Sequence, residues 1–293
     1  MKKLFLLLVA GLWLTAAAKT AQVTGDVTVV DSAAYFPQLN ADGTRLLYSS
    51  TEGDALYLKD LTSQETRVVS REGMPGIDAI FGRDGEVCYV TAISDKNNLL
   101  YRSIHRFDPL TGNDRIVLKN QRGAVHAIKG SRGTAYVGEH KSAMTEKAGL
   151  LAWTLGPQLY VVSNGVQRVL QPVSNTVGYL WAAVSPDGSK LLFVAAGKGL
   201  YVCDLQGKIL AHLGKYLMPC WLDNEHIVAM GHFGNVQRHS ASNLYLLSAD
   251  GSFSQQLTDL EDGAIQPMVN EQGHVTYTTK SGQVHIMTLE VSE

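Results

Sequence analysis

The 293-residue sequence is poor in the residues that mark several special classes of protein. It has three cysteines, eight prolines, a net charge of −2 and no run of Lys and Arg longer than two residues. Three cysteines without paired spacing do not form a disulfide scaffold, and the balanced charge leaves no basic footprint for nucleic acid. The composition therefore indicates a globular domain. Its cysteines are expected to be small buried residues with free thiols. The alternative, that two of them form one disulfide, stays open.

The first 18 residues have the layout of a secretory signal peptide. Two lysines precede an apolar run from Leu4 to Leu14, and three alanines end the segment at Ala18. A basic start, an apolar centre and small residues are typical of a cleavable export signal, and a membrane span would need about 20 apolar residues. The sequence predicts cleavage after Ala18 and a periplasmic or secreted protein without a membrane span. Residues 19–293 are expected to form one domain.

A hairpin pattern recurs six times along the chain. Each copy has an apolar strand, a tight turn and a second apolar strand, and the turns recur about every 46 residues. Residues that tolerate positive φ are what such short connections require. The six turns are Asp42-Gly43, Asp84-Gly85, Arg132-Gly133, Asp187-Gly188, Asp223-Asn224 and Gln272-Gly273.

Most copies continue into a second hairpin, as in GLYVCDLQGKILAHL from Gly199. Four strands in about 45 residues match a propeller blade and no helical repeat. The sequence therefore predicts an all-β, six-bladed β-propeller of four-stranded antiparallel blades. The sixth copy lacks a fourth strand, whereas GDVTVVDS precedes the first copy without a partner. We expect the N-terminal strand, at about 26–31, to join the last blade and close the ring.

The repeat from Ser185, with SPDG, an apolar strand, LY-x-x-DL and a last apolar strand, resembles the β-propeller repeats of TolB-like proteins. The resemblance covers about residues 25–293 and implies an exported propeller that binds partners at one end of its channel. TolB itself has an additional α/β domain before its propeller, so a role in the Tol envelope complex is not implied. Similar repeats occur in oligogalacturonate lyase and in prolyl-oligopeptidase-type peptidases, so the fold alone selects no function.

The sequence contains no motif that identifies a catalytic centre. A G-x-S-x-G nucleophile elbow, a phosphate loop, a dinucleotide fingerprint and an H-E-x-x-H metal helix are all missing from it. No catalytic residue, metal ligand or cofactor is predicted. Binding of a divalent metal ion stays open as an alternative. The close pair His232 and His239 is expected to be solvated. Histidines in strand-like runs, such as His126, are expected to be structural.

Loop length distinguishes the two faces of the predicted propeller. In each blade, the link between strands two and three lies on the same face of the propeller as the links between blades, and this face is here called the link face. The Asp-Gly turns lie on the opposite face, here called the turn face. Long links in copies two, three and five, such as 139–156, predict a binding site on the link face, because sites favour loops over rigid scaffolds. The candidate binding residues are Asp95, Lys96, His140, Lys141, Trp153, His232, Phe233, Arg238 and His239.

Four aromatic residues recur near the first strand of their copies: Phe36, Phe81, Trp181 and Trp221. Packing between neighbouring blades is the favoured interpretation, and a stacking platform along the channel is the alternative. Altogether the sequence predicts a monomeric binding module whose partner is an envelope protein, a peptide or a glycan. The alternative is a lyase-like, carbohydrate-active enzyme with a His and Arg site on the same face, which a metal could assist.

Overall fold

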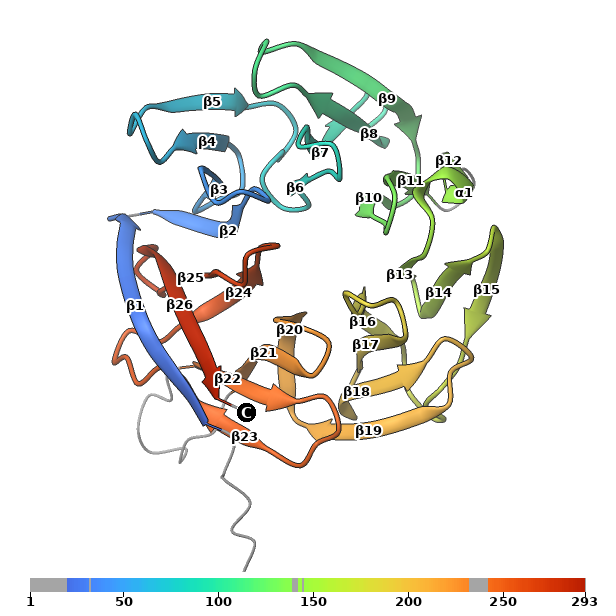
Figure 1. Cartoon of the computed structure of the whole chain (residues 1–293). Helices are drawn as coiled ribbons and strands as arrows, with labels where there is room; N and C mark the ends of the chain where they lie inside the picture. The colour runs from blue at the N-terminus through green and yellow to red at the C-terminus, as the bar shows by residue number, and fades with distance from the viewer. Residues whose placement is uncertain (1–19, 32, 139–141, 144, 232–241, 293) are drawn as a thin grey trace, which may run out of the picture.

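The protein is described from a computed structural model, which covers residues 20–31, 33–138, 142–143, 145–231 and 242–292. Small antiparallel sheets stand around a central axis, each with one of its end strands nearest the axis (Figure 1). This arrangement is a β-propeller, and it confirms the predicted all-β fold. No helix within the described ranges is long and apolar enough to cross a membrane.

Five of the six repeats form the predicted four-stranded antiparallel blade. Within each blade, the strands follow chain order from the axis outward, and the last blade takes its fourth strand from the start of the chain. Blades 1 and 2 consist of β2 (Ala34–Leu39), β3 (Arg45–Ser50), β4 (Leu56–Asp60), β5 (Thr66–Ser70), β6 (Ile80–Phe81), β7 (Val87–Ser94), β8 (Leu100–Phe107) and β9 (Asp114–Gln121). Blades 4 and 5 consist of β16 (Tyr179–Val184), β17 (Lys190–Ala195), β18 (Gly199–Asp204), β19 (Ile209–Gly214), β20 (Tyr216–Trp221), β21 (His226–Gly231), β22 (Asn243–Ser248) and β23 (Ser254–Gln256). Blade 6 consists of β24 (Ile265–Val269), β25 (Val275–Thr278), β26 (Val284–Ser292) and β1 (Thr20–Val30).

The third repeat differs from the other five, because it is divided into two three-stranded sheets. The first sheet is followed by the one-turn helix α1 (Thr145–Ala148). The sheets contain β10 (Val125–Lys129), β11 (Thr134–Gly138) and β12 (Ser142–Ala143), then β13 (Leu151–Leu155), β14 (Gln158–Ser163) and β15 (Val166–Leu170). The segment 139–156 was predicted to be one long link. Its end is instead β13, which pairs with β14 across the tight Gly156-Pro157 connection.

The N-terminal strand closes the ring as predicted. β1 pairs antiparallel with β26, with Asp26 opposite Met287 and Val27 opposite Ile286. The carboxylate of Asp26 accepts a hydrogen bond from the Tyr277 hydroxyl at 2.6 Å and lies 3.2 Å from His285 Nδ1. Because these side chains belong to β25 and β26, the closing strand is tied to two strands of the last blade.

Apolar side chains pack mainly between neighbouring sheets. Phe81 is buried with Leu47 and Val87 between blades 1 and 2, and Trp221 is buried with Leu192 between blades 4 and 5. The three cysteines are unpaired. Cys88 and Cys203 are completely buried, and burial raises the pKa of both thiols to about 12. They are therefore small core residues and not reactive thiols.

The Asp-Gly turns follow the predicted chemistry. Four of the turns have a glycine with φ between 73° and 82°, a conformation that residues with a Cβ rarely adopt: Gly43, Gly85, Gly188 and Gly273. In the turn of blade 4, Asp187 accepts hydrogen bonds from the Ser185 hydroxyl at 2.6 Å and from the Ser189 backbone N–H at 3.0 Å. Hydrogen bonds to the ionised form, first that of Ser185, lower the pKa of Asp187 to about 2.

This turn predicts a specific contribution to acid sensitivity. The pKa of Asp187 is about 2 in the folded protein, whereas the ordinary pKa of an aspartate is 3.8, so only the unfolded chain takes up this proton between those values. Its contribution to stability is therefore complete above about pH 4 and is lost as pH falls toward 2. In denaturant titrations across this window, Asp187→Asn is expected to lose less stability than the wild type. Parallel pH profiles for the two proteins would contradict the assignment.

Candidate functional site

A cavity of about 600 Å³ lies at the centre of the ring. Its walls are the first strands β2, β6, β10, β16 and β24, together with β13 of the divided third repeat. Lining residues occur at both ends of these strands, such as Trp181 toward the link face and Glu271 toward the turn face. The cavity therefore follows the axis of the propeller, where six separate segments of the chain contribute side chains.

Four of the inner strands carry the same backbone irregularity. A register shift interrupts the pairing of β2, β16, β20 and β24 with the following strand. At each shift one residue has positive φ: Phe36 at 52°, Trp181 at 52°, Met218 at 48° and Gln266 at 56°. This conformation costs about 1–2 kcal/mol for a residue other than glycine. Backbone strain of this kind clusters at ligand sites. Its repetition in four inner strands therefore indicates a candidate site at this level of the ring.

An aspartate and a histidine take the corresponding place in blade 2 and in the third repeat. Phe36, Trp181 and Gln266 each lie six residues before the first residue of their turn, as do Asp78 and His126. Asp78 Oδ2 is 3.9 Å from His126 Nδ1, and both side chains line the cavity. We call Phe36, Asp78, His126, Trp181, Met218 and Gln266 the ring residues.

The ring residues combine an aromatic surface with polar groups. Trp181 keeps 38% of its surface exposed although it lines the cavity. Gln266 accepts the backbone N–H of Phe36 at 2.8 Å, which links blade 6 to blade 1 at this level. A cavity lined by an indole, a carboxylate and an imidazole can stack on a ligand and hydrogen-bond to it.

The turn end of the cavity holds a group of three charges. Arg83 Nη1 and Lys129 Nζ each lie 2.8 Å from Oε1 of Glu271. Glu271 follows β24 of blade 6, so its side chain reaches past blade 1 to blade 2 and the third repeat. The hydrogen bond from Lys129 is the main cause that lowers the pKa of Glu271, and Glu271 is therefore ionised at neutral pH.

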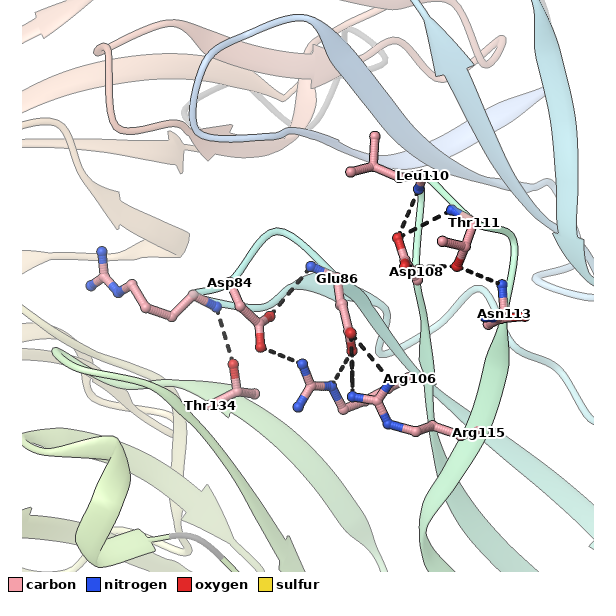
Figure 2. A network of polar contacts seen from close by, with 10 residues as sticks. Asp84, Glu86, Arg106, Asp108, Leu110, Thr111, Asn113, Arg115 and Thr134 are labelled. Atoms are coloured by element: carbon pink, nitrogen blue, oxygen red, sulfur yellow. Dashed lines mark hydrogen bonds and ion pairs between the residues drawn. The ribbon is translucent and has the colours of Figure 1, made fainter.

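A second ion network stabilises blade 2 beside this group. Arg106 pairs with both Asp84 and Glu86, and Arg115 pairs with Glu86 at 3.0 Å (Figure 2). Arg106 is mostly buried, whereas Arg115 is half-exposed. The two carboxylates nearest to Arg83 in the sequence are therefore engaged within their own blade.

The structure describes three of the nine predicted binding residues and does not bring them together. Trp153 is in β13, with 5% of its surface exposed, and its ring stacks on Tyr160 at a centroid distance of 5.0 Å. It borders the cavity as part of a strand and not as part of a link-face loop. Asp95 accepts the backbone N–H groups of Asn97 and Leu99, so it orders its own turn, and Lys96 is exposed. The remaining six lie outside the described residues: His140, Lys141, His232, Phe233, Arg238 and His239.

The prediction for the recurring aromatics is correct for Phe81 and Trp221, which pack between blades. It is wrong for Trp181, which is exposed in the cavity because the bulge in β16 turns its backbone to positive φ. His126, expected to be structural, also faces the cavity. The sequence does carry a signal for this level: Phe36, Met218 and Gln266 each precede a proline, five or six residues before the turn of their repeat.

Comparison with solved structures finds this fold in proteins of low sequence identity. TolB from Acinetobacter baumannii matches with a TM-score of 0.53 and 18% identity, over 78% of this chain and 55% of TolB. The fold is a TolB-like β-propeller. The chain thus spans about half the length of that TolB. An oligogalacturonate lyase from Vibrio parahaemolyticus matches with a TM-score of 0.58 and 14% identity, over 92% of this chain and 96% of the lyase. No family model and no curated protein sequence matches the chain.

The described residues include no group of three or more His, Cys, Asp or Glu side chains placed to hold a metal ion. The histidines among the candidate binding residues, His140, His232 and His239, are outside those residues. The site that the structure does define is the axial cavity, with Asp78, His126 and Trp181 toward one end and the Arg83, Lys129 and Glu271 group at the other.

Proposed function

We propose that this propeller is a binding module whose ligand occupies the axial cavity from the link face. The observation that carries the proposal is Trp181, an exposed aromatic residue held at positive φ on the wall of a cavity of about 600 Å³. Ligand sites are concave and combine apolar walls with a few placed polar groups. Asp78 and His126 supply such groups in the lining of the same cavity.

The exposed apolar residues support a peptide or protein ligand. Of sixteen exposed large apolar residues in the described chain, seven are on β1 or the outer strands of the blades. Only Leu110 is on the turn face. The other eight are on or next to link-face connections: Met74, Ile77, Ile93, Leu100, Val177, Leu180, Trp181 and Leu217. This asymmetry between the faces is typical of an interaction surface. We also propose that the protein is exported and acts in the periplasm or outside the cell.

A thermal-shift screen against short peptides and glycans tests the proposal, because a ligand that binds only the folded state raises the melting temperature. For each probe that stabilises the wild type, Trp181→Ala is expected to weaken binding about tenfold or more, the usual cost of removing a tryptophan anchor. Leu210→Ala removes an apolar residue that is 50% exposed on the outer strand β19, away from the cavity, and serves as the control. Equal losses in both variants, or no shift with any probe, would overturn the proposal.

A carbohydrate-active enzyme is the second candidate function. It is favoured by the match over 96% of an oligogalacturonate lyase, a protein whose whole length has this fold. Incubation with oligogalacturonate, with and without EDTA, tests it through the ultraviolet absorbance of an unsaturated product. Product formation that EDTA abolishes would establish a metal-dependent lyase, and absence of product under both conditions would reject this candidate for that substrate.

A further inference from the structure

The turn end of the cavity has two cations for one carboxylate. Arg83 and Lys129 contact the same oxygen of Glu271, each at 2.8 Å. In the described part of the chain, neither cation forms an ion pair with a different carboxylate, because Asp84 and Glu86 are paired with Arg106 and Arg115. The charges of Arg83, Lys129 and Glu271 sum to +1, and the two cations attract an anion that reaches them.

The arginine is held in place by groups other than Glu271. Its Nε donates to the Gly130 carbonyl oxygen at 3.1 Å, and its backbone N–H donates to Thr134 Oγ1 at 3.0 Å. Glu271 contacts the Nη1 atom of the guanidinium. A guanidinium fork matches a carboxylate through two parallel hydrogen bonds. Because both of these contacts are made by the third repeat, Arg83 stays in place when Glu271 moves away.

Glu271 is a weakly bound occupant of this position. Its side chain is 48% exposed, and those of Arg83 and Lys129 are 38% and 33% exposed. Ion pairs with this exposure contribute little stability, because water screens them. Another carboxylate of suitable shape can therefore take the place of Glu271 at small cost.

We propose that Arg83 and Lys129 form a carboxylate-binding subsite, and that Glu271 is an internal occupant which a ligand carboxylate displaces. The inference deepens the proposed function, since it names the ligand group that the far end of the cavity recognises. An extended peptide of about six residues spans about 20 Å, which is the length of an inner strand with its turn. A peptide that enters beside Trp181 can thus place its terminal carboxylate on Arg83. A small free dicarboxylate reaches the same cations from the turn face.

Matched acid and amide probes test the subsite and distinguish the two sources. The probes are succinate against succinamide, and the peptide acetyl-Ala-Leu-Ala-Leu-Ala with a free carboxyl end against its amide. The readout is the NMR signal of the Arg83 Nε–H in the full chain. The acid of at least one pair is expected to shift this signal, and its amide is expected to leave the signal unchanged. Equal effects of acid and amide in both pairs would overturn the proposal.

Two variants separate displacement of Glu271 from nonspecific attraction. Glu271→Gln removes the internal competitor and is expected to tighten binding of the acid probe about fivefold to tenfold, the size of two exposed ion pairs. Arg83→Gln is expected to abolish the preference for the acid. Lys208→Gln removes one charge from an exposed position on the turn face outside the cavity and is expected to change nothing. Unchanged affinity in Glu271→Gln, or equal losses in Arg83→Gln and Lys208→Gln, would reject the subsite.

The same measurements show whether the subsite or the binding function fails. Trp181→Ala weakens binding of the peptide acid and its amide alike if the proposed function holds, and it leaves succinate binding unchanged. If Arg83→Gln still binds the peptide but no longer prefers the acid over the amide, then Arg83 recognises the carboxylate alone. Succinate binding without any peptide binding would support the subsite with a small ligand as its source.

Discussion

Deletion of residues 20–30 is expected to prevent the protein from folding into a stable ring. The deletion removes the nine aligned pairs that β1 forms with β26 and leaves the edge of β26 open. It also uncovers Met287 and Tyr277, which are almost completely buried in the core of blade 6. The expected loss is comparable with the whole stability of a domain, about 5–15 kcal/mol. Circular dichroism and size-exclusion chromatography of the truncated chain would show it, and cooperative melting at the wild-type temperature would contradict it.

A point substitution in the same strand gives a graded test. Asp26→Ala leaves the Tyr277 hydroxyl without its 2.6 Å acceptor and removes the contact with His285. We expect a loss of about 1–3 kcal/mol, the usual cost of leaving a mostly buried polar group unpaired. Val27→Thr changes a residue of β1 that is 61% exposed and is the matched control, with an expected effect near zero. Equal effects of the two substitutions in urea titrations would show that β1 does not anchor blade 6 through Asp26.

Gly199→Ala is expected to destabilise the protein by about 3 kcal/mol or more, because a positive-φ penalty of about 1–2 kcal/mol adds to a backbone clash. Gly199 begins β18 with φ at 119°, and a Cβ there would lie 2.3 Å from the carbonyl oxygen of Gly214. The two residues meet where β18 and β19 pair beside a register shift. Because the obstacle is backbone in a paired strand, it cannot move without breaking the blade.

The control for this prediction is Gly165→Ala. Gly165 has φ at 74° in the turn between β14 and β15, and nothing lies within 4 Å of its would-be Cβ. This substitution isolates the conformational cost and is expected to lose about 1 kcal/mol. Chemical denaturation of both variants separates the conformational cost of positive φ from the cost of the backbone clash. If Gly199→Ala costs no more than Gly165→Ala, then the close approach of the Gly214 backbone has no energetic role.

Most of the fold could be predicted because its information is local. An Asp-Gly pair between two apolar runs specifies a hairpin wherever it occurs, and Asp42-Gly43 and Asp187-Gly188 form the turns that the pattern indicates. The closing role of β1 followed from counting strands, since a ring needs a partner for each edge. The third repeat departed from the pattern because Leu151–Leu155 pairs with its own neighbour, β14, and not with the preceding sheet.

The candidate site is less predictable from the sequence than the fold, because most of its side chains come from inner strands and not from long loops. Trp153 was placed on such a loop and lies buried in β13. Trp181 was expected to pack between blades, yet its backbone conformation presents it to the cavity. A positive φ at a tryptophan arises from a bulge in a paired strand, so no local propensity of the residue itself announces it.

By itself, the sequence determined the repeat, the hairpin turns and the need for an N-terminal strand in the last blade, since each of these depends on residues a few positions apart or on the number of strands. Only the tertiary structure decided which side chains meet at the axis. Glu271 lies 188 positions from Arg83 in the chain, and the two are 2.8 Å apart because ring closure brings blade 6 around to the start of the propeller. The chemistry of the cavity is therefore a property of the closed ring, which no single repeat contains.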